Sequence, residues 1–355
     1  MKWGKRALAL FCVLAAAVSV TACGKPAVNR DPKGKAYFSY FDTVSYVYSY
    51  AEDSAEEFDA RSAEVSAILY RYHQLFDIYH EYSGINNLCT INRLAGGEPV
   101  AVEQELIDFL LYARELYDRT GGEMNILLGA VLTVWHDCRT EASENPSAAR
   151  LPTEAQLLEA AKHTDISLLE IDTQNSTVRL TDPEASIDVG ALGKGYATQK
   201  AAERLEQLQA SGYVLNIGGN ICIIGRKPSG ESWTTGVRDP RNPDGPFAAT
   251  LTLADTSCVT SGNYERYYTV DGKRYHHLID KDTLWPADYV ASLTVITKDS
   301  GLADALSTAL FCMPYEEGLA LAESFGDVEV LWVFSDGTLK HTPGLADALI
   351  KETTA

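Results

Sequence analysis

The sequence predicts an α+β fold in which mixed sheets and packed helices form one compact unit. Two observations predict this class. Segments with apolar residues at helical spacing alternate along the 355 residues with short runs in which polar and apolar positions alternate, as in strands. Some of these runs meet across turn residues, most clearly at Asp271-Gly272, which is typical of antiparallel hairpins. Removal of a leader would leave roughly 330 residues, enough for a large core in one or two domains.

The first 36 residues are predicted to lie outside this unit. Residues 1–22 carry three basic residues and then an apolar run over 7–20, the pattern of a secretory signal that is short for a membrane span. Val20-Thr21-Ala22-Cys23 resembles a bacterial lipobox, so we expect cleavage before Cys23, lipid on its thiol, and a flexible tether over 23–36. An uncleaved anchor and a simple secretory signal are the alternatives. Lipid at Cys23 would hold the protein on the extracytoplasmic face of the bacterial cell membrane.

The charge of the chain limits its partners. The formal net charge is −19, and it becomes −22 without the leader, because 49 acidic residues then stand against 27 basic ones. A chain this acidic does not suit nucleic acid or an anionic lipid surface as its partner. A phosphorylated ligand would need a metal ion to offset the repulsion.

The cysteines indicate neither a zinc motif nor a disulfide framework. Of the seven, Cys12 would leave with the leader and Cys23 would take lipid. The other five are scattered without close pairs, and Cys222 and Cys312, which sit within apolar runs, are expected to be small buried side chains. A single disulfide of unassigned pairing is the alternative.

The N-terminal half is predicted to be mainly helical. Residues 54–76 and 103–120 have apolar positions at helical spacing, and Gly121-Gly122 ends the second helix. Residues 123–137 are almost all apolar and are expected to be a buried loop and helix. The other predicted elements are a strand at 38–49, a loop with a short helical turn at 77–93, a polar excursion at 139–151, a helix at 153–162, and strands at 168–171 and 177–180.

A strand, a glycine loop and a helix are predicted in the middle of the chain. Residues 186–189 alternate polar and apolar side chains, and Gly190, Gly193 and Gly195 lead into a helix expected at 196–210. Exposed amides at a helix N-terminus favour an anion such as phosphate. The glycine spacing fits neither a Walker A loop nor a good dinucleotide fingerprint, so a phosphate site and a tight structural turn remain equally open.

The C-terminal half is predicted to consist mainly of strands. The Asp271-Gly272 pair joins residues 267–270 and 274–279 in a hairpin. Residues 300–311 form a helix with a serine cap. The other predicted strands are at 214–217, 221–224, 234–237, 247–253, 292–296, 328–334 and 338–341, of which the last two form a hairpin.

Asp304 and Thr308 are candidate ligands for a hard cation. Their spacing places both side chains on one face of the predicted helix, where their oxygens can reach one Mg²⁺. The alternative is that Thr308 packs against the preceding turn and Asp304 is a cap or a solvated side chain. The surrounding alanines and leucines indicate a buried helix, and a buried carboxylate without a partner is costly. Asp304 is therefore expected to have a partner.

A pair of histidines, His276 and His277, ends the second strand of the predicted hairpin. Adjacent side chains of a strand face opposite ways, so only one of the two can point into a given site. His277, next to Leu278-Ile279-Asp280, is the candidate for a proton-transfer group. A surface or core histidine is the alternative.

Several motifs, taken together, resemble the ApbE-type flavin transferase family (FAD:protein FMN transferase). The resemblance spans residues 38–345 and implies one two-lobed domain over 37–350, with FAD between the lobes. The motifs are TINR and GGEMNILLGAVLTVWHD in the N-terminal half, followed by SIDVGALGKGYATQKAAE, LNIGGNI, TSGNYERYY, HHLIDKDTLWPA and ADALSTALF.

The resemblance implies an enzyme that binds FAD with Mg²⁺, cleaves its pyrophosphate, attaches FMN to a threonine of an acceptor protein and releases AMP. It implies metal ligands at Asp304, Thr308 and the backbone carbonyl of Ala191. It implies that His277 activates the acceptor hydroxyl. The implied FAD contacts are Tyr79, Glu123, Met124, Asn125, Asp188, Lys194, Ser261 and Ile279.

The implied partners are FAD and a membrane-associated redox subunit with an FMN-binding domain, and not nucleic acid. Two alternatives stay open: an FAD pyrophosphatase of the same architecture that gives FMN and AMP, and a non-catalytic flavin-binding lipoprotein. The sequence departs from the family at Met124-Asn125, where many members have Phe-Asp, at Phe41, where methionine is often found, and over 280–286, which lacks the usual glycine. These departures concern flavin-ring recognition and the choice of acceptor more than the type of reaction.

Overall fold

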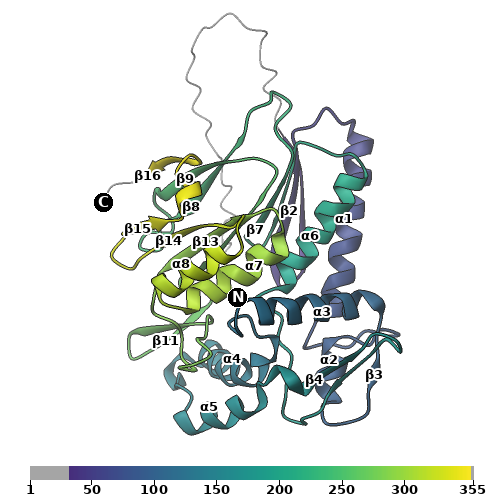
Figure 1. Cartoon of the computed structure of the whole chain (residues 1–355), viewed down its shortest axis with the longest axis vertical. Coiled ribbons are helices and arrows are strands. Elements are labelled where there is room, and N and C mark those ends of the chain that lie inside the picture. The colour runs from purple at the N-terminus through teal and green to yellow at the C-terminus, as the bar shows by residue number, and fades with distance from the viewer. Residues whose placement is uncertain (1–31, 353–355) are drawn as a thin grey trace, which may run out of the picture. The chain divides into compact units, whose positions relative to one another are not determined.

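The main sheet of the protein has eight strands, and every neighbouring pair is antiparallel (Figure 1). The computed structural model describes residues 32–352, so the predicted signal, Cys23 and most of the tether lie outside the described residues. In sheet order the strands are β1 (Lys33–Tyr40), β2 (Thr43–Ser49), β6 (Tyr213–Ile217), β7 (Asn220–Ile224), β10 (Ser257–Gly262), β13 (Ser292–Thr297), β14 (Glu329–Val333) and β15 (Leu339–His341).

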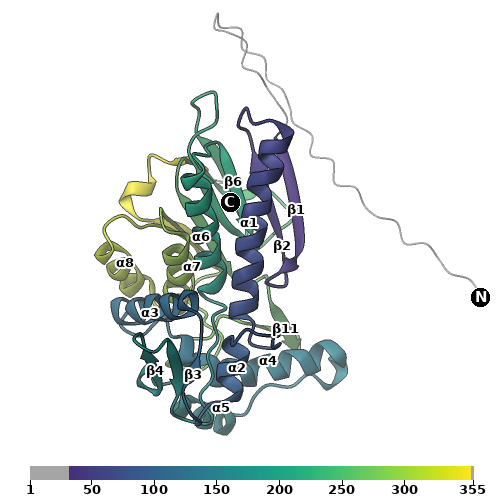
Figure 2. The ribbon, with the colours of Figure 1, turned by 90° about the vertical axis from the view of Figure 1, so that its right-hand side faces the viewer.

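Helices cover one face of this sheet and a smaller sheet covers the other. In β14 the side chains of Val330 and Trp332 join the core under the helices, whereas Leu331 and Val333 join a second core on the opposite face, because successive side chains of a strand alternate. Figure 2 shows three of these helices, α1, α6 and α7, side by side. The helices are α1 (Ala55–Phe76), α6 (Gly193–Gln207), α7 (Ser300–Ala309) and α8 (Tyr315–Ser324), and the smaller sheet contains β16 (Leu349–Glu352), β9 (Phe247–Leu253) and β8 (Trp233–Arg238).

The remaining elements lie together in the lower part of Figure 1. A third core joins Trp135 of the helix α4, Leu157 of α5, Tyr268 of β11 and the buried Leu284. No helix within residues 32–352 is long and apolar enough to cross a membrane. The elements are α2 (Leu88–Arg93), α3 (Gln104–Arg119), α4 (Gly129–Glu144), α5 (Glu154–Ala160), the sheet β3 (Val100–Ala101), β5 (Thr177–Leu180) and β4 (Leu169–Asp172), and the hairpin β11 (Tyr267–Val270) and β12 (Lys273–His276).

The structure confirms the α+β class and most of the predicted elements, while the two-lobed arrangement stays a prediction. Ser54 caps α1 in a capping box with Glu57, as expected for a helix that begins there. The hairpin turn at Asp271-Gly272 has positive φ angles of 49° and 80°, the geometry for which Asp-Gly is suited. The five cysteines among the described residues are all free, and Cys222 and Cys312 are buried as expected.

The prediction for residues 38–49 was wrong. A hairpin replaces the single strand: the chain turns at Phe41-Asp42, where both φ angles are positive, 54° and 50°. Phenylalanine is an unusual residue at such an angle, so no turn signal was visible in the sequence. The first strand also begins at Lys33, so the last part of the predicted tether is paired in the sheet.

The central segment also differs from its prediction. Residues 186–189 form no strand and pair with none of the strands within residues 32–352, because the backbone of Ile187 bonds instead to the side chain of Asn92, at 2.8 and 2.9 Å. The helix α6 begins at Gly193, so two of the three loop glycines lie in its first turn.

Two further helix predictions were wrong in detail, and one helix was missed. Asp299, not a serine, caps α7, because its Oδ1 accepts from the amides of Gly301 and Leu302. The helix α4 continues to Glu144, into the predicted excursion, and α8 was not predicted.

Candidate active site

The carboxylate of Asp304 is buried where the N-terminus of α6 meets α7. The residue is 5% exposed, and its Oδ2 accepts a hydrogen bond of 2.8 Å from the backbone amide of Gly195. A Cβ at position 195 would lie 2.4 Å from both the Asp304 Cβ and the carbonyl oxygen of Ser300, so the two helices can approach this closely only at a glycine. Burial raises the pKa of Asp304, against the charge of Lys194 and the amide of Gly195, which lower it. The expected partner of Asp304 is thus the N-terminus of α6.

Other oxygens at this junction are free to accept a ligand. Asn220 bonds to Asp304 through its side chain, yet its own Oδ1 is buried without a hydrogen-bond partner in the described part of the chain. The Gly195 amide, which in a regular helix would donate to the carbonyl of Ala191, donates to Asp304 instead. Within residues 32–352 the hydroxyl of Thr308 takes part in no hydrogen bond. The neighbouring Ser307 hydroxyl donates to the carbonyl of Asp304, at 2.9 Å.

This set of donors suits a hard cation. Mg²⁺ takes oxygen ligands and keeps several waters, so it is usually held by one or two carboxylates together with phosphate oxygens of a substrate. Among the described residues no group of three His, Cys, Asp or Glu side chains could hold a metal ion. A metal at Asp304 would therefore depend on Thr308, on the Ala191 carbonyl and on the phosphates of a ligand.

The strand β10 brings Ser261 to the same junction. The Ser261 hydroxyl oxygen lies 2.8 Å from that of Ser307, which stands on α7 between Asp304 and Thr308. Both serines are held by this contact. Ser261 was predicted from the sequence as an FAD contact; it lies beside the helix that carries Asp304 and Thr308, and its contact with FAD stays a prediction.

His277 follows directly after β12, and its ring is a neutral proton acceptor. Its Nδ1 lies 3.3 Å from the carbonyl oxygen of Arg266, so Nδ1 carries the hydrogen when this bond is made and Nε2 is left as the acceptor. Burial, and after it the charges of nearby basic groups, Arg266 first, together lower the pKa of His277 to about 3. His276 faces elsewhere, as expected, because its Nε2 lies 2.9 Å from the carbonyl oxygen of Ala287.

An exposed aromatic ring lies at the other end of this region. Tyr79, in the loop after α1, is 57% exposed, and its ring centroid lies 5.5 Å from that of His136 on α4. Asp77 fixes this loop by accepting from the amide of Tyr79 at 2.7 Å. Burial raises the pKa of the Tyr79 hydroxyl, the charge of Asp188 raises it further, and the charge of Arg139 lowers it. Tyr79 and Asp188, both predicted from sequence, are thus neighbours.

The side chains of four predicted FAD contacts are already occupied. Met124 and Ile279 are buried in the apolar cores, so a contact with a ligand would have to come from their backbones. Asn125 uses both ends of its amide locally: Oδ1 accepts from Leu127 and Nδ2 donates to the carbonyl of Thr164, each at 2.9 Å. Glu123 forms an ion pair of 3.1 Å with Lys281. Lys194 has no acidic partner in the part of the chain that the structure describes, and its Nζ donates to the Gly190 carbonyl at 3.2 Å.

Sequence reasoning missed four polar residues that the structure brings to this region: Asn220, His136, Arg139 and Arg266. Arg266 lies inside the motif TSGNYERYY and Asn220 inside LNIGGNI, so the motifs were seen but these side chains were not singled out. Arg139 follows the motif that ends at Asp137 and was assigned to an excursion. Only its place on the extended helix α4 shows that it lies near His277.

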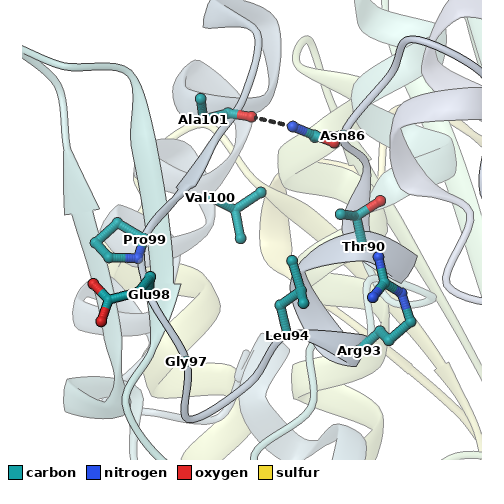
Figure 3. Close-up of a pocket in the computed structure, with 9 residues that line it drawn as sticks. All are labelled: Asn86, Thr90, Arg93, Leu94, Gly97, Glu98, Pro99, Val100 and Ala101. Atoms are coloured by element: carbon teal, nitrogen blue, oxygen red, sulfur yellow. Dashed lines mark hydrogen bonds between the residues drawn. The ribbon is translucent and has the colours of Figure 1, made fainter.

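A pocket of about 550 Å³ lies elsewhere, between α2 and β3 (Figure 3). Asn86 crosses it and donates to the carbonyl of Ala101 at 2.8 Å. Its one arginine, Arg93, is paired with Glu81 at 2.7 Å. None of the predicted site residues lines this pocket. Its lining residues are Asn86, Thr90, Arg93, Leu94, Gly97, Glu98, Pro99, Val100 and Ala101.

The fold and the site define an α+β protein in which a buried carboxylate, a neutral histidine and an exposed aromatic ring belong to one candidate site. Comparison with known proteins narrows this class. The sequence model of the ApbE family matches residues 41–332, and the chain belongs to the ApbE family. The resemblance noted in the sequence is thereby confirmed.

Relatives and solved structures agree with this assignment. The chain is 30% identical to the "FAD:protein FMN transferase" of Treponema pallidum (strain Nichols), over 95% of this chain and 93% of that protein. It is 28% identical to the protein of the same name from Klebsiella pneumoniae (strain 342), over 78% and 82% of the two chains. The crystal structure of the ApbE protein from Thermotoga maritima has a TM-score of 0.77, with 28% identity over 88% of this chain and 98% of that one. The flavin transferase ApbE from Vibrio cholerae, 24% identical with a TM-score of 0.72 over 88% and 97%, shares the fold.

Proposed function

We propose that this chain is an Mg²⁺-dependent FAD:protein FMN transferase that attaches FMN to a threonine of an extracytoplasmic acceptor flavoprotein and releases AMP. The names of its relatives support the transferase activity. One observation of the site carries the proposal. The charge of Lys194 lowers the pKa of both His277 and the buried Asp304, so a proton acceptor and an oxygen-lined cation site lie within electrostatic range of one lysine.

The residues divide the transfer between them. The threonine oxygen attacks the phosphorus on the flavin side of the pyrophosphate, and Nε2 of His277 takes the threonine proton. The bond from that phosphorus to the bridging oxygen breaks, and AMP leaves with the electron pair. Lys194 holds the phosphates in line for this attack. Tyr79 offers its exposed ring to the flavin, and Asp188 supports that side of the site.

Asp304, Thr308 and the carbonyl of Ala191 would hold the metal ion, with Asn220 orienting the carboxylate. The ion, when bound, offsets the charge that develops on the pyrophosphate. The same ion accounts for how an acidic chain can take a pyrophosphate. Ser261 would approach the phosphates from β10.

Transfer is tested by weighing the acceptor. The chain from Gly24 onward, which keeps every described residue, is incubated with FAD, Mg²⁺ and a candidate FMN-acceptor domain, and the acceptor is weighed by intact mass spectrometry. The expected result is a gain of one FMN that disappears when the acceptor threonine is replaced by valine or when EDTA is added. Free FMN and AMP without a mass gain would instead mark an FAD pyrophosphatase. Bound FAD with neither product would mark a flavin-binding lipoprotein.

We also propose that Cys23 carries lipid and anchors the protein on the extracytoplasmic face of the membrane. The lipobox-like sequence before Cys23 supports this. The partner would then be a membrane-associated redox subunit whose FMN-binding domain faces the same side. Cys23→Ser should move the protein from the detergent phase to the aqueous phase on Triton X-114 partition, and equal partition of both forms would contradict the anchor.

A further inference from the structure

We infer that Arg139 and Arg266 bind the phosphate of the FMN half of FAD, between the aromatic pair Tyr79–His136 and the proton acceptor His277. The inference deepens the proposed function and rests on it. It names the residues that recognise the phosphorus under attack, whereas Lys194 and the Asp304 junction serve the rest of the pyrophosphate.

The first support is that these arginines lack acidic partners. Across residues 32–352 neither guanidinium takes part in a salt bridge, although the chain carries 49 acidic residues against 30 basic ones. Arg150, beyond the end of the same helix, is by contrast paired with Glu141 at 2.8 Å. Arg114, Arg226 and Arg274 also form no salt bridge within residues 32–352, so what distinguishes Arg139 and Arg266 is that both lie in the candidate site.

The second support is their placement. Arg139 donates from Nη2 to Nδ1 of His136 at 2.9 Å, and the His136 ring packs on the exposed ring of Tyr79. Arg266 holds His277 through its carbonyl oxygen, at 3.3 Å. The guanidinium of Arg139 is thus tied to the ring end of the region, and the backbone of Arg266 to its proton acceptor. A ligand with its ring on Tyr79 would bring its nearest phosphate to these groups.

The third support is that the positive charges interact with one another. Burial lowers the pKa of Arg139, and the charge of Arg266 lowers it further. The charges of both arginines also lower the pKa of His277. Like charges held together are unfavourable unless an anion joins them. Guanidinium groups bind phosphate oxygens through paired hydrogen bonds. The cluster is therefore prepared for a phosphate before the ligand arrives.

This role fits the transfer step. When the threonine oxygen bonds to the flavin-side phosphorus, negative charge spreads over the oxygens that the phosphorus keeps. These oxygens remain on the FMN phosphate as it is transferred to the threonine, so Arg139 and Arg266 would contact them throughout the reaction. The bridging oxygen departs with AMP, toward Lys194 and Asp304. His277 holds the proton taken from the threonine.

The test compares the binding of three ligands to the full mature chain. Affinities for FMN, riboflavin and AMP are measured by flavin fluorescence and calorimetry for wild type, Arg139→Gln and Arg266→Gln. Each substitution should weaken FMN binding about tenfold to a hundredfold, because a hydrogen bond to a charged group is lost. Riboflavin and AMP should bind as before. Arg150→Gln and Arg274→Gln are the matched controls, since Arg150 is paired with Glu141 and Arg274 lies over Tyr267 on the neighbouring strand.

Other outcomes overturn the inference. Unchanged FMN affinity in both variants, or a loss of AMP affinity in its place, would remove the arginines from the flavin-side phosphate. A raised KM for the acceptor with unchanged FMN affinity would make them a docking site for acidic groups of the acceptor. Arg139→Lys keeps the charge but loses the paired hydrogen bonds, so it should weaken FMN binding less than Arg139→Gln does, and the inference stays testable even if Arg139→Gln folds poorly. The binding comparison needs no turnover, so it is read separately from the success or failure of the transfer assay.

Discussion

The two ends of the candidate site are built differently. The Asp304 end consists of regular elements: α6, α7 and β7 meet with buried side chains, and a glycine permits the contact. The Tyr79 end consists of a loop, a helix flank and the end of a hairpin, and it exposes an aromatic ring. Glu123, next to the departure Met124-Asn125, pairs with Lys281 inside the departing segment 280–286, so these two departures from the family meet in space. The Asp304 end, which would hold the metal ion, is closely packed, and the Tyr79 end, which would recognise the ring and the acceptor, is partly exposed.

The largest expected effect on FMN transfer is at the Asp304 end. Asp304→Asn should lower FMN transfer by on the order of a thousandfold or more, because the charge that would hold the metal ion is lost. Transfer is followed by the mass of the acceptor over a Mg²⁺ titration. Asp299→Asn at the start of the same helix is the control: asparagine caps a helix about as well as aspartate, so this change removes a carboxylate charge but neither the cap nor a metal ligand. Equal turnover in Asp304→Asn and wild type would reject the metal assignment.

The pH dependence of transfer tests the role of His277, near the Tyr79 end of the site. A histidine acts as a base only when neutral, so its activity is lost as pH falls through its pKa. Since that pKa is about 3 in the free protein, kcat/KM for FAD should stay level well below pH 6. Phosphates of bound FAD would offset the charges of Arg266, Lys194 and Arg139 and raise the pKa, so the acid limb of kcat should lie at higher pH than that of kcat/KM.

The matching substitution is His277→Gln. It should lower transfer roughly a hundredfold to ten-thousandfold and leave FAD affinity nearly unchanged, because a general base is removed and no phosphate contact is lost. FAD affinity is measured by fluorescence. Loss of FAD binding in this variant would show that His277 positions the ligand and is not the base.

A smaller effect, on stability, is expected from Gly195→Ala. The new Cβ would lie 2.4 Å from two atoms of α7, so the helices must separate, at a cost of roughly 1–3 kcal/mol in the free energy of unfolding. Gly318→Ala in α8 is the matched control, since its Cβ would lie 3.5 Å from Met313, and it should stabilise by roughly 0.5–1 kcal/mol. Urea unfolding of both variants measures the difference, and the same sign for both would contradict the close approach of α6 and α7.

The smallest effect concerns Leu284, in the segment where the family usually has a glycine. Its φ is 63°, an angle that costs a non-glycine residue about 1–2 kcal/mol, but its side chain is buried and contributes about 2–3 kcal/mol. Leu284→Gly should therefore destabilise by only about 1 kcal/mol in a thermal or urea melt. Asp271→Gly, at an exposed turn residue with φ 49°, buries nothing and should be neutral or slightly stabilising. A stabilised Leu284→Gly would mean that the burial of this side chain has been overestimated.

The Asp304 end could be predicted from the sequence better than the Tyr79 end. The helix around Asp304 was visible from its spacing of alanines and leucines, and the need of a buried carboxylate for a partner was inferred. The partner itself was not, because Gly195 is 109 residues away and only the packing of α6 on α7 joins them. Local patterns also misled at 186–189, where strand-like alternation exists but the side chain of Asn92 takes the place of a neighbouring strand. Arg139 on α4 lies far along the chain from the hairpin that carries Arg266 and His277, so their convergence could not be predicted from residue spacing.

The unpaired arginines lie in a chain of formal net charge −19, and this contrast bears on the kinetics of binding. At low ionic strength the carboxylates of the whole surface repel an incoming anion over long distances, while the arginines attract it only over the last few ångströms. Salt shortens the Debye length to about 10 Å at 0.1 M, which weakens the long-range repulsion before the short-range attraction. The association rate of a flavin nucleotide should therefore rise with added salt, opposite to the behaviour of an electrostatically steered encounter.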